Sequence, residues 1–311
     1  GGGMISRDFF RFNTTNTISA DIDDEAVLDE AIAWCDRCEL LLSRVNPASE
    51  LFRLNHAQGY PTLVDPELAA FIETSLSYCR RTDGLFDVTM GSATQLWDFK
   101  QQTVPSADSL AAALQQVDYR NIAVEGSVVT LHDPCACVDL GGIAKGYIAD
   151  GLLALLRKRG VRHALVNLGG NVAVMGGKPD GSPWRVGIRK PLPSSTLPLL
   201  DAFATVDVRD GSVVTSGIYE RAFERDGTLY HHILDPRTGR PAATDLLSAT
   251  VVSSTSLDAD GFTTALVIMG ADQALAFVEK DPALEAVLVT NQGDVLATSG
   301  IGSDLPFELI G

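Results

Sequence analysis

The chain has 311 residues, 45% of them hydrophobic, which is enough to fill the core of one large domain or two modest ones. Its 24 basic and 40 acidic side chains leave a net charge of −16, which makes a nucleic-acid surface or an anionic membrane a poor partner. An anionic ligand would therefore need a local cation, either a metal ion or a placed Lys or Arg. No apolar run approaches the length that crosses a bilayer, so we expect no membrane span.

The N-terminal segment gives no sign of export. Residues 1–3, three glycines before Met4, resemble a vector-derived scar. Residues 5–12 contain charges where a signal peptide would be apolar. No cysteine precedes Cys35, so we expect no lipid anchor at the N-terminus.

The five cysteines form an odd, sparse set, which suits a reducing compartment. Cys35 and Cys38 have the C-x-x-C spacing, but they fall inside a long amphipathic pattern rather than at the strand-to-helix turn of a redox motif. Pairing them with Cys135 and Cys137 would give a zinc site. Buried free thiols account for the same residues with fewer assumptions.

Helical patterns dominate the first part of the chain. Asp23 and Asp24 give an acidic start to an apolar stripe, and Asp65–Pro66 is a favoured cap and first-turn pair. The stretch from Gly84 to Lys100 is apolar and irregular, and no element is assigned to it. The predicted elements are helices over 27–45, 49–55 (a short turn), 66–82 and 106–117, the last capped by Ser106, and then a hairpin over 122–131.

Strands dominate the rest of the chain, with helices between them. A strand tail over 137–140 leads into glycine-rich residues and a helix to Arg159, and residues 163–175 are predicted to form one buried strand interrupted by Gly169–Gly170. The remaining elements are strands at 184–189, 202–208, 212–215, 229–234 and 248–252, a helix closed by Gly270, a segment at 273–278, a hairpin around 291–294 and a surface loop at 191–198. This order predicts an α+β or mixed α/β fold.

Asp260 and Thr264 are the first candidates for chemistry. They lie four residues apart in the helix predicted before Gly270, so their side chains share one face. A carboxylate and a hydroxyl are hard oxygen ligands, which Mg²⁺ prefers while it keeps water or phosphate in its other positions. The alternative is structural, with Asp260 as the cap of the helix and Thr264 as a space-filling residue.

Two glycine-rich turns could bring backbone N–H groups to a phosphate. The first, residues 139–146, is predicted at a strand-to-helix junction and includes the positive charge of Lys145. It matches neither a P-loop nor a dinucleotide fingerprint. The second, residues 167–171, has Gly169 and Gly170 inside a strand pattern, which suggests close approach of a ligand to the backbone. A plain tight turn explains both equally well.

His232 is the third candidate. It is followed by Asp235–Pro236 and by a Thr238–Gly239 turn, a dense set of reactive groups for a loop. An imidazole can carry a proton near neutral pH or hold a phosphate or an acceptor group. The alternative is a hairpin end stabilised by Asp235 and Pro236. No G-x-S-x-G motif is present, and nothing argues for a nucleophilic triad.

Seven short motifs follow one another along the chain, in a match that extends from about residue 40 to the end. They are Ser49-Glu50-Leu51 with Leu54-Asn55, Thr82-Asp83-Gly84-x-Phe86-Asp87-Val88-Thr89, Asp139-Leu140-Gly141-Gly142-Ile143-Ala144-Lys145-Gly146-Tyr147, Leu168-Gly169-Gly170-Asn171, Thr215-Ser216-Gly217-x-Tyr219, His232-Ile233-Leu234-Asp235-Pro236-Arg237-Thr238-Gly239-Arg240-Pro241 and Ala259-Asp260-x-x-x-Thr264-Ala265. Each motif is weak alone. In this order they resemble the ApbE family, the FAD:protein FMN transferases.

The resemblance implies a fold and an activity. The fold would be an ApbE-like, T-fold-like arrangement of antiparallel sheets flanked by helices, with residues 4–311 as one domain, either undivided or in two lobes with the FAD site between them. The activity would be Mg²⁺-dependent transfer of FMN from FAD to a Ser or Thr hydroxyl of an acceptor protein, which forms a phosphoester and releases AMP. A Mg²⁺-dependent FAD pyrophosphatase that yields FMN and AMP, or a non-catalytic FAD carrier, would share most of the same residues.

The resemblance also implies roles for individual residues. His232 and Asp260 would be catalytic, with His232 either removing the acceptor's proton or orienting groups. Asp260, Thr264 and the carbonyl of Gly142 would hold Mg²⁺. The residues that would contact FAD are Thr89, Met90, Gly91, Asp139, Lys145, Gly169, Gly170, Asn171, Ser216, Gly217, Tyr219 and Ile233.

One segment departs from the family pattern. Phe12-Asn13-Thr14-Thr15-Asn16-Thr17-Ile18 stands where the family has a Met-Gly-Thr segment that helps to form the flavin site, so the N-terminal contact to the flavin is left open. The family's signal peptide and lipid anchor are also missing. The resemblance therefore implies a cytoplasmic enzyme with a cytoplasmic acceptor protein.

Overall fold

The computed structural model describes residues 3–193 and 201–310. Residues 1–2 of the predicted scar and 194–200 of the predicted surface loop lie outside the described residues. The chain forms two compact units. The first comprises Gly1–Arg37, Ile143–Gly217 and Thr244–Gly311, and the second comprises Cys38–Gly142 and Ile218–Ala243. Within the described ranges, no helix combines the length and the apolar content that a membrane span requires.

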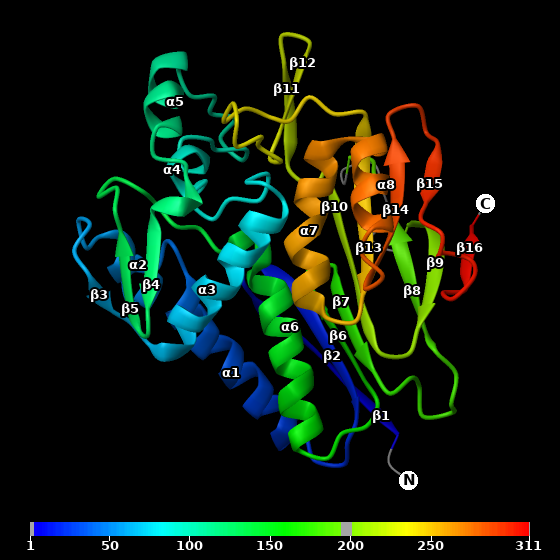
Figure 1. Cartoon of the computed structure of the whole chain (residues 1–311). Helices are drawn as coiled ribbons and strands as arrows, with labels where there is room; N and C mark the ends of the chain where they lie inside the picture. The colour runs from blue at the N-terminus through cyan, green and yellow to red at the C-terminus, as the bar shows by residue number, and fades with distance from the viewer. Residues whose placement is uncertain (1–2, 194–200, 311) are drawn as a thin grey trace. The chain divides into compact units, whose positions relative to one another are not determined.

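The first unit is built on an eight-stranded antiparallel sheet (Figure 1). Its order is β1 (Met4–Arg11), β2 (Thr14–Asp21), β6 (Ala164–Leu168), β7 (Asn171–Met175), β10 (Gly211–Gly217), β13 (Leu246–Ser253), β14 (Leu284–Thr290) and β15 (Val295–Ala297). Antiparallel strands covered by helices confirm the α+β class predicted from the sequence.

Two helices cover part of one face of this sheet. Helices α7 (Ser256–Met269) and α8 (Ala271–Glu279) pack on β10, β13 and β14, as Figure 1 shows. Phe262 of α7 is fully buried, and its ring lies 5.5 Å from that of Phe277 of α8. Burying one such side chain contributes roughly 1.5–3 kcal/mol, so this face anchors α7 firmly.

A three-stranded sheet covers the other face. It consists of β8 (Trp184–Arg189), β9 (Ala202–Val208) and β16 (Phe307–Leu309) in the order β16-β9-β8. The core between the two sheets is made of small and β-branched side chains, which suit a pleated surface. Its buried members are Val174, Val186, Ile188, Ala204, Val206, Val208, Val213, Val252 and Val287.

The N-terminal hairpin was not predicted. β1 and β2 pair along their whole lengths, and β2 also pairs with β6, so residues 4–21 form the edge of the main sheet. The turn between them uses Phe12 and Asn13, both with φ of 58°. Two successive positive φ values are those of a type I′ turn, which usually takes Asn or Gly. Because Phe12 occupies the first position of this turn, the usual Asn-Gly pattern of a hairpin is absent from the sequence.

The single strand predicted over 163–175 is wrong. The structure has a hairpin of β6 and β7, in which Leu168 pairs with Asn171 across the two-residue turn Gly169–Gly170. The two glycines have φ values of 57° and 106°, which favour residues without a Cβ. The hairpin places Asn171 opposite Leu168, whereas Asn167 pairs with Val172 and lies on the other face of the sheet.

Helix α6 (Gly141–Lys158) begins earlier than predicted. Its first residue is Gly141, so residues 141–146 form helical turns and not a loop before the helix. The predicted strand tail over 137–140 reduces to a single bridge between Met90 and Cys137. Helix α1 (Ala26–Leu42) ends before Val45, which is 69% exposed and does not continue the apolar stripe.

The second unit holds the remaining helices and two small sheets. The two predicted caps are confirmed: Asp65 accepts a hydrogen bond from Glu67 N–H, and Ser106 accepts one from Ser109 N–H. Ser49, which was not predicted as a cap, accepts a hydrogen bond from Phe52 N–H in the same way. Helix α5 ends at Leu114, three residues before the predicted end. The elements are α2 (Glu50–Asn55), β3 (Thr62–Leu63), α3 (Pro66–Arg81), α4 (Gly91–Thr94), α5 (Ala107–Leu114), η1 (Tyr119–Asn121), β4 (Ile122–Glu125), β5 (Val128–Leu131), β11 (Ala222–Arg225) and β12 (Thr228–His231).

An aromatic cluster connects the unassigned stretch 84–100 to the β11–β12 hairpin. Trp97 stacks on Phe99 and lies 6.0 Å from Tyr230, which in turn stacks on Phe223. The indole N–H of Trp97 donates to the carbonyl of Gly239 at 3.0 Å. The strand predicted over 229–234 ends at His231, so His232 follows the hairpin.

Candidate active site

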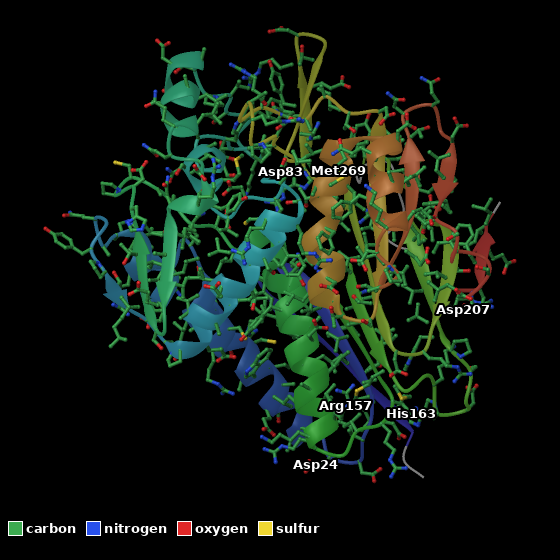
Figure 2. The ribbon with its side chains drawn as sticks, in the orientation of Figure 1. Asp24, Asp83, Arg157, His163, Asp207 and Met269 are labelled. Carbon is green, nitrogen blue, oxygen red and sulfur yellow. The ribbon has the colours of Figure 1, made fainter. Side chains whose placement is uncertain are left out.

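Helix α7 starts at Ser256, and Thr255 is its N-cap, with the hydroxyl accepting a hydrogen bond from Asp258 N–H. The alternative in which Asp260 caps the helix is therefore wrong. Asp260 and Thr264 lie inside the helix, one turn apart, and both side chains are half-buried. The helix ends at Met269, which Figure 2 labels.

The carboxylate of Asp260 is held from helix α6. Its Oδ2 accepts a hydrogen bond of 2.9 Å from Gly146 N–H. Burial raises the pKa of Asp260 to about 6, and the nearby Asp150 carboxylate acts in the same direction. The Gly146 N–H, the Asn171 amide and the Lys145 ammonium act in the opposite direction and do not outweigh burial. A cation would stabilise the charged form of this carboxylate.

Lys145 meets the turn of the β6–β7 hairpin. A Cβ added to Gly169 would lie 2.9 Å from Lys145 Nζ and 2.9 Å from Thr14 Oγ1, so both side chains lie directly over this glycine. The predicted residues Lys145 and Gly169 are thus brought together. Thr14 is an addition that sequence reasoning missed, since its segment was treated only as a departure from the family pattern.

Two buried amides flank the same turn. Asn171 is 8% exposed. Among the described residues, no atom lies in hydrogen-bonding geometry with its Nδ2. The Asn171 amide is nevertheless close enough to Asp260 to lower the pKa of that carboxyl. Asn16 donates through Nδ2 to three backbone carbonyls, while its buried Oδ1 has no partner among the described residues. Asn16 and Asn171 both pair with Leu168, so they lie on one face of the sheet. Buried polar atoms without partners are expected where a ligand or water binds.

Ser216, a predicted FAD contact, is engaged by α7. Its hydroxyl donates to Thr263 Oγ1 at 2.7 Å, and Thr263 is fully buried next to Thr264. Gly217 ends β10 and pairs with Ser248. These contacts fix α7 on the sheet, and the flavin contacts of Ser216 and Gly217 stay a prediction.

In the second unit, Thr89 is fully buried and binds a carboxylate. Its hydroxyl and its backbone N–H both donate to Asp87 Oδ1, at 2.6 and 2.8 Å. Burial raises the pKa of Asp87, against the hydrogen bonds from Thr89 and from Tyr119 N–H. Asp87 therefore organises the loop that carries Met90 and Gly91.

This loop lies beside the segment of Asp139. The N–H of Asp139 donates to the carbonyl of Val88 at 2.7 Å, and a Cβ on Gly91 would lie 2.9 Å from Cys137 Sγ. The carboxylate of Asp139 accepts from Gly141 N–H at 2.8 Å and lies 3.5 Å from Arg44 Nε. The side of Gly142 where a Cβ would project faces the ring of Phe86, 3.2 Å away. The structure therefore brings together four predicted residues, Thr89, Met90, Gly91 and Asp139. Arg44 and Phe86 lie in the same place, and neither was predicted as a site residue.

His231 and His232 have different environments. His231 is buried, with Nδ1 accepting from Ile233 N–H and Nε2 close to the carbonyl of Ala242, so it is a structural residue. His232 Nδ1 lies 3.3 Å from the carbonyl of Arg221, which leaves Nε2 as the acceptor, 3.7 Å from Glu220. Burial lowers the pKa of His232 to about 4, and the Arg221 charge acts in the same direction. At neutral pH its imidazole is therefore uncharged.

The predicted FAD contacts Tyr219 and Ile233 also belong to the second unit. Ile233 is buried and gives its N–H to His231, and Tyr219 is half-buried. The second unit thus carries Thr89, Met90, Gly91, Asp139, Gly142, Tyr219, His232 and Ile233, and the first carries Lys145, Gly169, Gly170, Asn171, Ser216, Gly217, Asp260 and Thr264.

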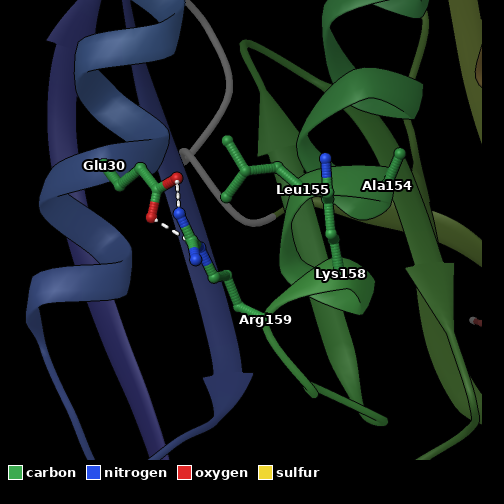
Figure 3. A pocket seen from close by; sticks show the side chains of 5 residues that line it. All are labelled: Glu30, Ala154, Leu155, Lys158 and Arg159. Carbon is green, nitrogen blue, oxygen red and sulfur yellow. Dashed lines mark hydrogen bonds and ion pairs between the residues drawn. The ribbon is translucent and has the colours of Figure 1, made fainter.

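The other candidate sites are weaker. A shallow pocket between α1 and α6 is lined by Glu30, Ala154, Leu155, Lys158 and Arg159, none of which was predicted as a site residue (Figure 3). Glu30 and Arg159 close it with a two-bond ion pair. Within residues 3–193 and 201–310, no three His, Cys, Asp or Glu side chains gather as a metal cluster, so the zinc alternative has no site there. Of the free thiols, Cys35, Cys38 and Cys79 are buried as predicted, whereas Cys135 is exposed and Cys137 half-buried.

Comparisons with known proteins give a consistent result. The profile of the ApbE family matches residues 12–288. An FAD:protein FMN transferase of Treponema pallidum is 37% identical over 294 residues, covering 89% of this chain and 80% of that protein. Another, from Klebsiella pneumoniae, is 34% identical over 281 residues, covering 89% and 86%.

Solved structures agree with the sequence comparisons. The apo flavinyl transferase ApbE of Pseudomonas stutzeri superimposes with a TM-score of 0.85 at 28% identity, over 96% of each chain. The ApbE protein of Thermotoga maritima gives a TM-score of 0.86 at 27% identity, over 96% of this chain and 97% of that one. The fold that was predicted from the motifs is confirmed.

Proposed function

We propose that this chain, which belongs to the ApbE family and is an FAD:protein FMN transferase, moves FMN from FAD to a Ser or Thr hydroxyl of an acceptor protein and releases AMP. The observation that carries the proposal is the cluster in the first unit, where Lys145, Gly169, Asn171 and Asp260 meet at one end of α6 and α7. A diphosphate needs nearby positive charge and hydrogen-bond donors. Lys145 and the buried Asn171 amide supply both.

Asp260 and Thr264 fit a divalent cation by their chemistry. A carboxylate and a hydroxyl one helical turn apart are hard oxygen donors, the kind that Mg²⁺ binds. Asp260 Oδ2 accepts a hydrogen bond from Gly146 N–H, which orients the carboxylate. We propose that these two residues hold Mg²⁺, with the Gly142 carbonyl as a third ligand. When bound, the ion would neutralise charge on the diphosphate oxygens.

The remaining chemistry is a displacement at phosphorus. The acceptor hydroxyl oxygen forms a bond to the FMN phosphorus, the bond from that phosphorus to the bridging oxygen breaks, and AMP leaves with the bridging oxygen. The hydroxyl proton must go to a base. His232 is uncharged at neutral pH and has Nε2 as an acceptor, so we propose that it receives this proton or orients the hydroxyl.

The family match runs continuously from residue 12 to 288 and so includes parts of both units. We therefore propose that residues 4–311 act as one flavin-transferase domain that uses FAD and an acceptor carrying a Ser/Thr flavinylation motif. The five free thiols support the cytoplasm as its compartment.

A transfer assay tests the proposal. Purified protein is mixed with FAD, Mg²⁺ and a cytoplasmic extract, flavin is detected by fluorescence on a denaturing gel, and AMP is measured in parallel. We expect a fluorescent protein band that forms only when Mg²⁺ is present. We expect AMP to be released only when the acceptor is present. Equally fast AMP release without any acceptor would show an FAD pyrophosphatase, and FAD binding without AMP would show a carrier.

A further inference from the structure

Asp150 is the single acidic residue of helix α6, and the mechanism proposed above does not use it. It lies in the middle of an otherwise apolar stretch, and its side chain is half-buried. A carboxylate in such a place normally has a partner that compensates for its burial.

The partner of Asp150 is the beginning of helix α7. Asp150 Oδ1 accepts a hydrogen bond of 2.8 Å from Ser256 N–H, and Oδ2 accepts one of 2.9 Å from Leu257 N–H. These are the first two residues of α7, whose N–H groups have no acceptor within their own helix. A side chain of α6 therefore caps α7 in addition to the local cap, Thr255.

The same two helices meet again one turn earlier on α6. Gly146 and Asp150 are four residues apart and share a face of the helix. Gly146 N–H binds Asp260 Oδ2, and a Cβ on Gly146 would lie 2.8 Å from Asp260 Cβ and closer still to the carbonyl of Ser256. Figure 1 shows α6 and α7 side by side. The contact of Asp150 thus lies on the same helix face as the contact that orients Asp260.

The choice of a carboxylate is informative. A neutral Asn or Ser could cap a helix, whereas Asp150 places a second negative charge close to Asp260, with which it repels. A cation at Asp260 would relieve this repulsion, which is weaker than the effect of burial on Asp260. Residues that orient metal ligands from behind typically change metal affinity by about 10–100-fold when they are replaced.

We propose that Asp150 is a positioning residue for the divalent cation: it fixes the first turn of α7 against α6 and thereby fixes the places of Asp260 and Thr264. The inference rests on the proposed function, because it needs the cation at Asp260. It assigns no direct contact between Asp150 and the ion or the flavin.

The test is Mn²⁺ binding by the full-length chain in the presence of FAD, with free Mn²⁺ measured by electron paramagnetic resonance. Asp150→Glu keeps the charge but is one methylene too long for the two hydrogen bonds to Ser256 and Leu257. Thr255→Ala is the matched control, because it removes a cap from the same helix without breaking the link to α6. Melting temperature and FAD affinity are measured for every variant.

We expect Asp150→Glu to bind Mn²⁺ about 10–100-fold more weakly than wild type, with FAD affinity measured in the absence of Mn²⁺ unchanged. Thr255→Ala should lose a comparable amount of thermal stability and bind Mn²⁺ as wild type does. Wild-type affinity in Asp150→Glu, or an equal loss in Thr255→Ala, would overturn the inference.

Two further measurements complete the design. If Asp150→Glu does not fold, Asp150→Asn is measured at low and high salt, because a loss caused by charge alone shrinks on screening whereas a loss of positioning persists. The proposed metal site is tested separately by comparing Asp260→Ala with wild type. If the two proteins bind Mn²⁺ equally well, the metal is not held by Asp260. In that case both proposals fall.

Discussion

Replacing Gly146 by Ala tests how closely helices α6 and α7 must approach. The added methyl group would lie 2.8 Å from Asp260 Cβ and 2.9 Å from the carbonyl carbon of Ser256. Real Cβ atoms do not come so close to other heavy atoms. Two of the atoms near the new methyl group are the carbonyl carbon and oxygen of Ser256, which belong to the backbone of α7 and cannot rotate away. The helix must therefore move, and the hydrogen bond from Gly146 N–H to Asp260 must lengthen.

The magnitude follows from two opposing terms. Overpacking of a tight contact costs about 1–3 kcal/mol. The gain in helix propensity from Gly to Ala returns roughly 1 kcal/mol. We expect the variant to lose about 0–2 kcal/mol of unfolding free energy, a shift of a few degrees in melting temperature. The larger effect should be on metal binding, because Asp260 is displaced directly.

Gly151→Ala is the matched control on the same helix. Its Cβ would lie 2.7 Å from Trp34 Cζ2, a half-buried ring on α1 that has no part in the candidate site. Thermal unfolding and Mn²⁺ titration of both variants give the comparison. Gly146→Ala should weaken Mn²⁺ binding at least tenfold, which corresponds to about 1.4 kcal/mol of binding free energy. Gly151→Ala should bind Mn²⁺ as wild type does. Equal affinities in the two variants would refute the reasoning.

The remaining predictions concern side chains of the site. Asp260→Ala should abolish Mg²⁺-dependent transfer, since Thr264 alone cannot hold the ion; wild-type rates at saturating Mg²⁺ would show that the ligand is elsewhere. Lys145→Gln should weaken FAD binding, measured by flavin fluorescence, by about tenfold, because one charge beside the diphosphate is lost; an unchanged dissociation constant would remove Lys145 from the site. His232→Ala should slow transfer and leave FAD binding intact, and a large loss of affinity would make His232 a binding residue instead. Because the pKa of His232 is lowered to about 4 in the folded state, the unfolded chain takes up the proton first as the pH falls below 6.5. Denaturant unfolding should therefore show wild type losing up to about 3 kcal/mol more than His232→Gln between pH 6.5 and 4, and parallel curves would contradict the burial of this imidazole.

Local signals in the sequence were sufficient for the capped helices. Asp65 and Ser106 were identified as caps because a short polar side chain before an apolar pattern binds the free N–H groups of the first turn, whereas the cap Ser49 was not predicted. For α7, the sequence left Asp260 as a possible cap, although Thr255 precedes the same helix. Only the structure shows which one binds the first-turn N–H groups.

The glycine pair 169–170 shows why local pattern alone is ambiguous. Glycines inside an apolar run fit a strand with a ligand close to its backbone and also fit a two-residue turn. The pairing of Leu168 with Asn171 decides for the turn. Lys145 and Thr14 nevertheless crowd the same glycine, so the predicted site and the hairpin coincide.

Contacts distant in sequence could not be predicted. Asp150 binds residues 106 and 107 positions away, and Gly146 binds Asp260 across 114 positions. No periodicity within α6 encodes those partners. One sequence signal was present, because Asp150 is the single acid within the apolar pattern of residues 141–158, and such a residue calls for a partner.

The placement of the cation is tested most directly by anomalous diffraction from crystals grown with FAD and Mn²⁺. We expect one anomalous peak about 2.0–2.2 Å from both a carboxylate oxygen of Asp260 and the hydroxyl of Thr264, with the FAD diphosphate bound to the same ion. A diphosphate bound with its metal at other side chains, and no peak at Asp260, would contradict the assignment.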